Sequence, residues 1–263
     1  LSKCNYGGDA EDILPKLLSA NPADRSFINM IREVSAIIED NSTKGLDFTK
    51  TIIRLFNPNN VEVAGYQTND NNQTITWNLN NPLPTDGSAD GVYKIEIKAI
   101  DKSNGESEYT TTFKYDTIVP VMASITPADG SVITTPLSEI IVKVSDAGSG
   151  IDFASSRASL NLKLGNQAIA GIIRTDNGVD TMTFRFPELT ENGKYTIELN
   201  IKDRASNEHP YIVEFDFGKA EDTLPEVLST DPVNKSFKNA ISSVTATIRD
   251  NSTKGLDFED STI

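Results

Sequence analysis

The sequence predicts an all-β chain built of tandem β-sandwich domains, and three observations favour this class. Apolar and polar residues alternate along many short segments, clusters of turn-forming residues separate these segments, and the whole pattern repeats at a long interval. No segment shows the periodicity of an amphipathic helix. The repeat defines the domain organisation.

Identical residues recur at a constant spacing along the chain. Pro15, Pro120 and Pro225 are separated by 105 residues each time. Residues 11–53 align without a gap with residues 221–263, and 24 of the 43 aligned positions are identical. Solenoid repeats are much shorter, at roughly 20–50 residues, whereas a unit of this length can form a domain with its own core.

This spacing divides the 263 residues into four parts. They are the tail of a preceding repeat (1–10), two complete repeats (11–115 and 116–220) and the truncated start of a further repeat (221–263). The segment LSKC at 1–4 also has some likeness to a bacterial lipobox ending in Cys4, although Lys3 departs from the small residue expected there. We interpret residues 1–8 as the last strand of a preceding repeat, because NYGGDAED (5–12) resembles DFGKAED (216–222), which ends a later one.

Each complete repeat contains about seven expected strands. The alternation is clearest in the second strand, where Val34, Ala36 and Ile38 share one face. Further strands are expected at 50–57, 61–67, 73–79, 91–101 and 108–115 in the first repeat, and at 158–164, 167–173, 180–186, 193–203 and 210–217 in the second. Seven short strands separated by turns are typical of an immunoglobulin-like sandwich. Tyr93 and Tyr195 begin the sixth strand, where a tyrosine corner would bond a phenol to the nearby backbone.

Several motifs resemble those of bacterial immunoglobulin-like, Big-type repeats in large surface or secreted proteins. The motifs are DTIVP (116–120), PADGS (127–131), SDAGSGID (145–152), GKY (193–195) and DRASN (203–207). The resemblance extends over nearly the whole chain. It implies an exported product, secreted or attached to the cell surface, in which such domains act as stalks, spacers or adhesive modules.

Composition narrows the possible functions further. The 24 basic and 38 acidic residues give a net charge of −14, which disfavours binding to nucleic acids and to anionic membrane surfaces. No run of 18 apolar residues is present, so no transmembrane helix is expected. The single cysteine, Cys4, and the single histidine, His209, provide no repeated nucleophile–base pair. We therefore expect that the chain is not an enzyme and has no catalytic residues.

Acidic residues recur in the loops that would meet at one pole of each sandwich. The linker, the B–C loop and the F–G loop share that pole in the immunoglobulin-like fold. The second repeat places Asp116, Asp146, Asp152 and Asp203 there, and the first places Asp12, Asp40, Asp47 and Asp101. Calcium takes about six to eight oxygen ligands, so a calcium site is one hypothesis. The alternative is turn formation, because Asp, Asn, Ser and Gly are common in loops without any metal.

Three functions remain open at this point. The sequence favours a structural spacer whose partners are the neighbouring repeats of the same chain. An adhesive module for a host or cell-surface glycan or protein would require an exposed, unrepeated aromatic patch, for which Tyr66 and Trp77 are the candidates. The third possibility is a non-catalytic appendage of a carbohydrate-active enzyme, with catalysis in another part of the protein.

Overall fold

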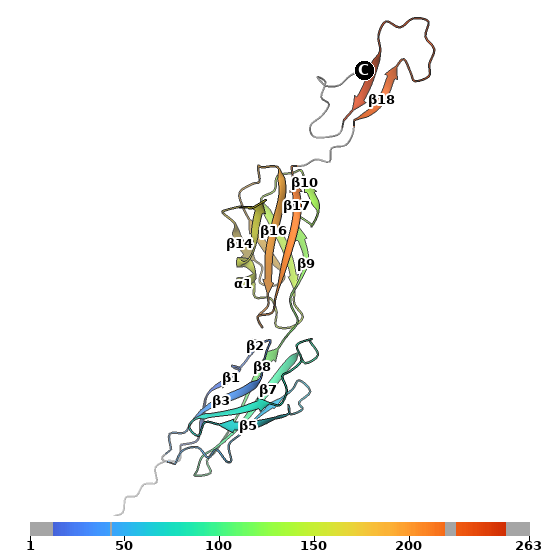
Figure 1. The fold of residues 1–263 in the computed structure, drawn as a ribbon. Coiled ribbons are helices and arrows are strands. Elements are labelled where there is room, and N and C mark those ends of the chain that lie inside the picture. Colours follow the sequence, from blue (N-terminus) through green and yellow to red (C-terminus); the bar gives the residue numbers. More distant parts are fainter. Residues whose placement is uncertain (1–12, 43, 219–224, 251–263) are drawn as a thin grey trace, which may run out of the picture.

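The computed structural model describes residues 13–42, 44–218 and 225–250, and it confirms the all-β class. The first sandwich consists of two four-stranded sheets (Figure 1). One sheet has the order β1 (Lys16–Asn21), β3 (Glu33–Glu39), β6 (Thr74–Leu79), β5 (Gly65–Asn69). The other has the order β2 (Ser26–Ile28), β8 (Glu106–Tyr115), β7 (Gly91–Ile100), β4 (Ile52–Phe56).

This strand order is that of an immunoglobulin-like sandwich. In the usual lettering the sheets read A-B-E-D and A′-G-F-C, with the first strand divided between them. The β2–β8 pair is parallel, whereas the other strand pairs of this sandwich are antiparallel. Because β1 and β2 belong to different sheets, the start of the repeat contacts both layers.

The second sandwich repeats this arrangement with one short helix and one short edge strand added. Its first sheet has the order β9 (Val121–Thr126), β11 (Glu139–Ser145), β15 (Thr181–Arg185), β14 (Ile173–Asp176). Its second has the order β10 (Ser131–Ile133), β17 (Glu208–Phe217), β16 (Gly193–Lys202), β12 (Asn161–Leu164), β13 (Gln167–Ala168). Helix α1 (Phe153–Ala158) precedes β12.

Each core lies between the two sheets of its own sandwich. Strands β7 and β16 have the same alternation of buried and partly exposed residues, as the period-two pattern predicts. The aromatic rings also match: Tyr93 stacks on Phe113 with centroids 5.5 Å apart, and Tyr195 stacks on Phe215 at 5.4 Å. The two repeats therefore pack their cores in the same way.

Both expected tyrosine corners are present. The Tyr93 hydroxyl donates to the backbone oxygen of Ala89 at 2.9 Å, and the Tyr195 hydroxyl donates to that of Glu191 at 2.8 Å. Each phenol is four residues from its acceptor and belongs to a ring that is almost fully buried. The bond ties the turn before the strand to the strand itself.

Some expected strands were wrong in extent. The strand expected at 61–67 begins only at Gly65, because residues 57–63 fold back on β4 through a bond from Val63 N to Leu55 O. The strand expected at 158–164 starts at Asn161, since α1 occupies the preceding turn. The segment 167–173 is not one strand, because it crosses between the sheets from β13 to β14.

The described part of the last repeat, residues 225–250, contains a two-stranded antiparallel sheet of β18 (Glu226–Asp231) and β19 (Thr245–Arg249). Its pairing matches that of β1 with β3. Val244 is 52% exposed, whereas its first-repeat counterpart, Val34, is fully buried. Nothing described here covers the face that is buried in the two complete repeats.

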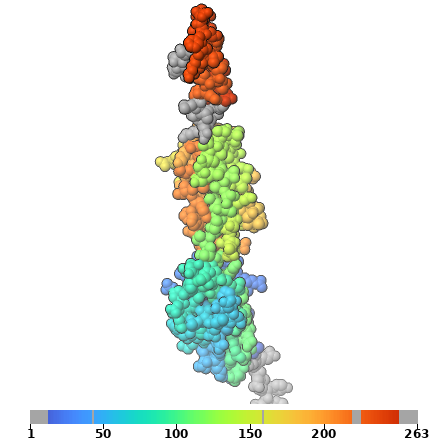
Figure 2. Space-filling model, turned by 90° about the vertical axis from the view of Figure 1, so that its right-hand side faces the viewer, coloured from blue at the N-terminus to red at the C-terminus, as the bar shows by residue number. Residues whose placement is uncertain are grey.

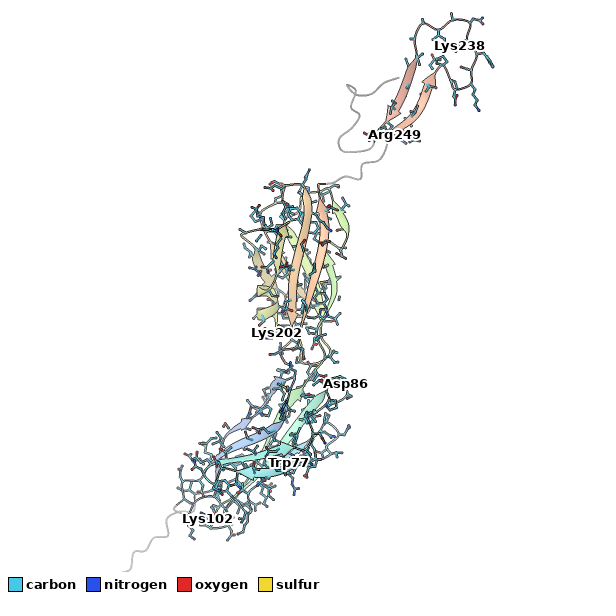
Figure 3. All side chains as sticks on the ribbon, viewed as in Figure 1. Trp77, Asp86, Lys102, Lys202, Lys238 and Arg249 are labelled. Atoms are coloured by element: carbon cyan, nitrogen blue, oxygen red, sulfur yellow. The ribbon has the colours of Figure 1, made fainter. Side chains whose placement is uncertain are left out.

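The two complete sandwiches follow one another end to end (Figures 1 and 2). Figure 3 labels residues that lie near the ends of the two sandwiches. Asp86 lies at the end of the first sandwich that faces the second, and Lys102 lies toward the opposite end. Lys202, at the end of β16, lies at the pole of the second sandwich that faces the first. The F–G loop of the second sandwich is therefore placed at the joint.

Candidate metal centre at the joint

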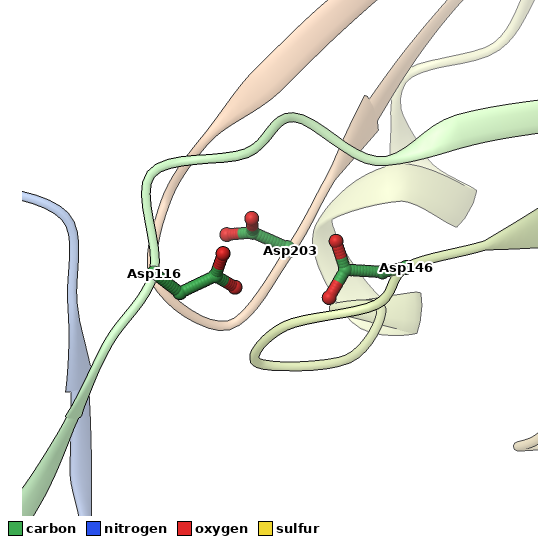
Figure 4. A group of neighbouring side chains, drawn as sticks. All are labelled: Asp116, Asp146 and Asp203. Carbon is green, nitrogen blue, oxygen red and sulfur yellow. The ribbon is translucent and has the colours of Figure 1, made fainter. Parts of the chain in front are cut away.

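Three carboxylates converge where the linker enters the second sandwich. Asp116 is the first linker residue, Asp146 follows β11, and Asp203 follows β16 (Figure 4). Each can offer an oxygen such that the three atoms lie within 4.8 Å of one another. Asp116 and Asp203 are buried, with 0% and 1% of their surface exposed, and Asp146 is partly buried. The group is thus a compact acidic cluster largely removed from water.

Asp116 receives hydrogen bonds from both sides of the joint. Its carboxylate accepts from the backbone amides of Ser149 and, at 3.3 Å, Ile118. Its own amide donates to the backbone oxygen of Ile28 in the first sandwich at 3.0 Å. Its backbone oxygen accepts from the side chain of Asn207 at 2.8 Å. This one residue is therefore bonded to the linker, to a loop of the second sandwich and to the first sandwich.

Asn207 links the cluster to the first sandwich. Its side-chain nitrogen donates to Asp203 Oδ2 at 2.8 Å as well as to the oxygen of Asp116, and its backbone amide donates to Asp203 Oδ1 at 2.8 Å. Its Oδ1 accepts from the side-chain nitrogen of Asn29 at 3.0 Å. A single buried amide thereby uses both its donors and its acceptor across the joint.

Asp146 has one satisfied oxygen and one unsatisfied oxygen. Oδ2 accepts from the amides of Gly148 at 3.0 Å and Gly150 at 2.7 Å. Oδ1 is buried and has no hydrogen-bond partner. Burial raises the pKa of Asp146, and the nearby charge of Asp116 adds to that rise. Burial likewise raises the pKa of Asp203, with smaller contributions in the same direction from Asp116 and Asp146.

Two basic residues contribute further contacts at the joint. The Lys114 ammonium of the first sandwich donates to the backbone oxygen of Gly148 at 2.5 Å, and its charge lowers the pKa of Asp146. The Arg204 guanidinium of the second sandwich lies over the ring of Phe27, 5.9 Å from its centroid. Lys114 therefore offsets part of the negative charge, while Arg204 adds a contact between the two sandwiches.

Two residues predicted to join these clusters have other roles. Asp152 caps helix α1, accepting from the amide of Ser155 at 3.2 Å and from its hydroxyl at 2.6 Å. Its carboxylate is committed to the helix start, which is why it lies outside the group of three. Asp47 behaves similarly, accepting from Thr49 and pairing with Lys50 at 3.3 Å. The bonds of these two residues are those expected of turn formation, and their part in a metal site stays a prediction.

The first sandwich has a related pair of acids. Asp101 is fully buried, and its Oδ1 accepts from the amides of Ser103 and Gly105. Asp40 Oδ1 accepts from the amide of Ser42. The Oδ2 atoms of both residues are buried and without a hydrogen-bond partner. Asp12, the remaining residue predicted for this group, lies outside the described residues.

Sequence reasoning did not assign a role to Asn207 or Lys114. Asn207 is the last residue of the DRASN motif. The motif therefore marks the position, but the sequence does not reveal the residues to which Asn207 is hydrogen-bonded. Lys114 carries no motif, and only the end-to-end placement of the sandwiches brings it near Gly148. His209 lies in β17, which begins two residues before the strand expected at 210–217, and its ring is 4.6 Å from that of Tyr211.

Comparison with known families identifies the second sandwich. Residues 116–218 match the model of a family described as bacterial Ig-like domain. This match covers the second sandwich, which is less than half of the 263-residue chain. It includes the linker residue Asp116 and both loops of the acidic cluster, and it agrees with the resemblance that the motifs of this repeat indicated.

Other comparisons give distant similarities in fold. CopC from Methylosinus trichosporium OB3b is 14% identical, covering 39% of this chain and 93% of CopC, with a TM-score of 0.31. Murine CEACAM1b is 13% identical, covering 77% and 99%, with a TM-score of 0.34. A marsupial T cell receptor is 13% identical, covering 81% and 77%, with a TM-score of 0.42. No curated protein matches the chain. Among the described residues, no helix combines the length and hydrophobicity required to cross a membrane.

Proposed function

We propose that the chain is an extracellular spacer in which consecutive sandwiches are held at a fixed angle. The observation that carries this proposal is the bonded joint. Asn207 contacts the linker at Asp116 and the first sandwich at Asn29 through one side chain. A flexible tether would have few such bonds, because its residues would be exposed to water.

The linker itself supports a stiff connection. Only residues 116–120 separate β8 from β9. The amide and hydroxyl of Thr117 each donate to the Asp90 carboxylate at 2.9 Å, which ties the linker back to the first sandwich. Pro120 is buried and restricts the backbone where the next strand begins. The linker is thus bonded to both neighbours within a few residues.

The exposed surface favours a spacer over an adhesive module. Within the described parts of the first two repeats, Tyr66, at 57% exposure, is the one Phe, Tyr or Trp side chain that is strongly exposed. Trp77 packs against the core and donates its ring N–H to the backbone oxygen of Val63 at 3.1 Å. The two residues do not form the aromatic patch that an adhesive role would require.

Small-angle X-ray scattering on the whole chain tests the spacer proposal. We expect an elongated particle whose profile fits one arrangement of the first two sandwiches. A profile that requires a mixture of bent and straight arrangements would contradict a fixed joint. Labelling of intact producing cells with an antibody raised against this chain tests the extracellular location, with permeabilised cells as the control. Labelling that appears only after permeabilisation would contradict it.

A further inference from the structure

One buried carboxylate oxygen at the joint has no hydrogen-bond partner. Buried polar atoms in proteins almost always have a hydrogen-bond partner, because leaving one unpaired is unfavourable. Here Asp146 Oδ1 has none, and its neighbours in the cluster, Asp116 and Asp203, are also acidic. None of these three carboxylates has a basic side chain within ion-pair distance among the described residues.

The first sandwich also has buried carboxylate oxygens without a hydrogen-bond partner, so this feature does not depend on the conformation of a single loop. Asp40 Oδ2 and Asp101 Oδ2 are both buried without a partner, and Asp101 is fully buried. These residues follow β3 and β7, as Asp146 and Asp203 follow β11 and β16. Both repeats therefore leave a carboxylate oxygen unpaired in the loop after the second strand of the first sheet, and the first repeat leaves another at Asp101, whereas both oxygens of Asp203 accept from Asn207.

A divalent cation matches the charge of the group in the second sandwich. Three carboxylates carry a charge of −3, and Lys114, bonded to the neighbouring Gly148 carbonyl, contributes +1. A charge of −2 remains to be balanced. The amide donors already occupy other lone pairs of these acids, so a cation would coordinate the oxygens that face one another.

The spacing of the carboxylate oxygens is compatible with one Ca²⁺ ion. Two oxygens that bind one Ca²⁺ at about 2.3–2.6 Å can be up to about 4.6–5.2 Å apart, whereas Mg²⁺ at about 2.0–2.1 Å allows only about 4.2 Å. The three carboxylate atoms lie within 4.8 Å of one another. This span is accessible to Ca²⁺ without movement of the loops. Backbone carbonyls and water would complete its coordination.

We propose that Asp116, Asp146 and Asp203 bind one Ca²⁺ ion at the joint and that the ion fixes the linker to the second sandwich. The inference rests on the proposed spacer function, because Asp116 is the linker residue that is bonded to both sandwiches. The ion joins this residue to the loops after β11 and β16, so its binding reduces motion at the joint.

Calcium titration of the whole, chelator-treated chain tests the site, followed by the backbone amide signals of Gly148, Ser149 and Asn207 in ¹⁵N NMR spectra. We expect saturable shifts of these signals with Ca²⁺ and weaker binding of Mg²⁺. In Asp146→Asn the affinity should fall at least tenfold; the asparagine oxygen can still accept from Gly148 and Gly150, so the loop is kept. Asp152→Asn is the matched control, because asparagine also caps helices, and it should leave the affinity unchanged.

Two results would overturn the proposal. One is a wild-type chain whose amide shifts with Ca²⁺ equal those with NaCl at the same ionic strength. The other is an Asp146→Asn variant that binds Ca²⁺ as tightly as the wild type while its other amide signals show a folded chain. The scattering experiment separates this failure from failure of the spacer: an elongated, uniform particle without calcium binding removes the ion but retains the spacer.

Discussion

The side-chain nitrogen of Asn207 donates a hydrogen bond to the backbone oxygen of Asp116 at 2.8 Å, which joins the F–G loop of the second sandwich to the first residue of the linker. The same nitrogen bonds to Asp203, and the side-chain oxygen of Asn207 accepts from Asn29. The joint thus depends on one buried amide in contact with three other residues. This relationship leads to the first prediction.

Asn207→Ala should weaken the second sandwich and the joint together. Loss of the side chain leaves buried polar groups unpaired, so we expect the free energy of unfolding to fall by about 1–3 kcal/mol. Urea denaturation measures the change. Asn161→Ala, at an exposed position on β12, is the control and should change it by less than about 0.5 kcal/mol. Equal effects of the two substitutions would contradict the role of Asn207.

Lys114→Gln should weaken the contact between the two sandwiches and strengthen the binding of calcium. Without its ammonium group, the bond to the Gly148 oxygen is weakened and the contact between the sandwiches loosens. Removal of a positive charge near the acids should raise calcium affinity by about threefold or more. Lys194→Gln, at the start of β16 and so at the opposite pole, should leave the affinity unchanged. Calorimetric titration decides, and a lower affinity in Lys114→Gln would contradict this charge balance.

The tyrosine corners should contribute equally to the two sandwiches. Tyr93→Phe and Tyr195→Phe each remove one hydroxyl bond while keeping the stacked ring. We expect each to lower the free energy of unfolding of its own sandwich by about 1 kcal/mol. Thermal denaturation followed by calorimetry measures both variants. An effect confined to one repeat would show that the two corners are not equivalent.

The β5–β6 turn should make stability depend on pH. Asp70 accepts from the amides of Asn72, Gln73 and Thr74, and these bonds lower its pKa to about 2. Because the folded pKa is below the ordinary value of 3.8, this stabilisation is present above pH 3.8 and is lost as the pH falls through about 2. Asp70→Ala should therefore lower the urea midpoint at pH 7 and have little effect at the acid end of this range.

The first sandwich provides a control for this titration. In the turn after β4, Asn57 accepts from the amides of Asn59 and Val61 at 3.0 Å each, but its side chain does not ionise. Asn57→Ala should lower the midpoint by the same amount at both pH values. A pH-dependent effect of Asn57→Ala, or a pH-independent effect of Asp70→Ala, would contradict the assignment.

The fold was largely predictable from the sequence because period-two alternation gives a strand two different faces. Tyr93 and Tyr195 were placed correctly, since each stands at the start of a long alternating segment. Helix α1 was missed because its six residues are too few for a helical period to be visible. Its start depends instead on one local bond from Ser155 to Asp152.

The acidic cluster was only partly predictable. Loop order in the fold was enough to bring Asp116, Asp146 and Asp203 to one pole. The sequence could not separate them from Asp152, because all four are loop carboxylates and only their local bonds differ. Lys114 could not be found at all, since its contact with Gly148 depends on how two domains meet.

The distance between the two sandwiches in solution tests the fixed joint most directly. Nitroxide labels at Thr68→Cys and Thr175→Cys, both exposed, in a Cys4→Ser background report this distance by double electron–electron resonance. The bonded joint predicts one narrow distance distribution, which broadens when Asn207→Ala is added. A broad distribution in the labelled chain that already has Asn207 would contradict the account, because it would show that the sandwiches move freely about the linker.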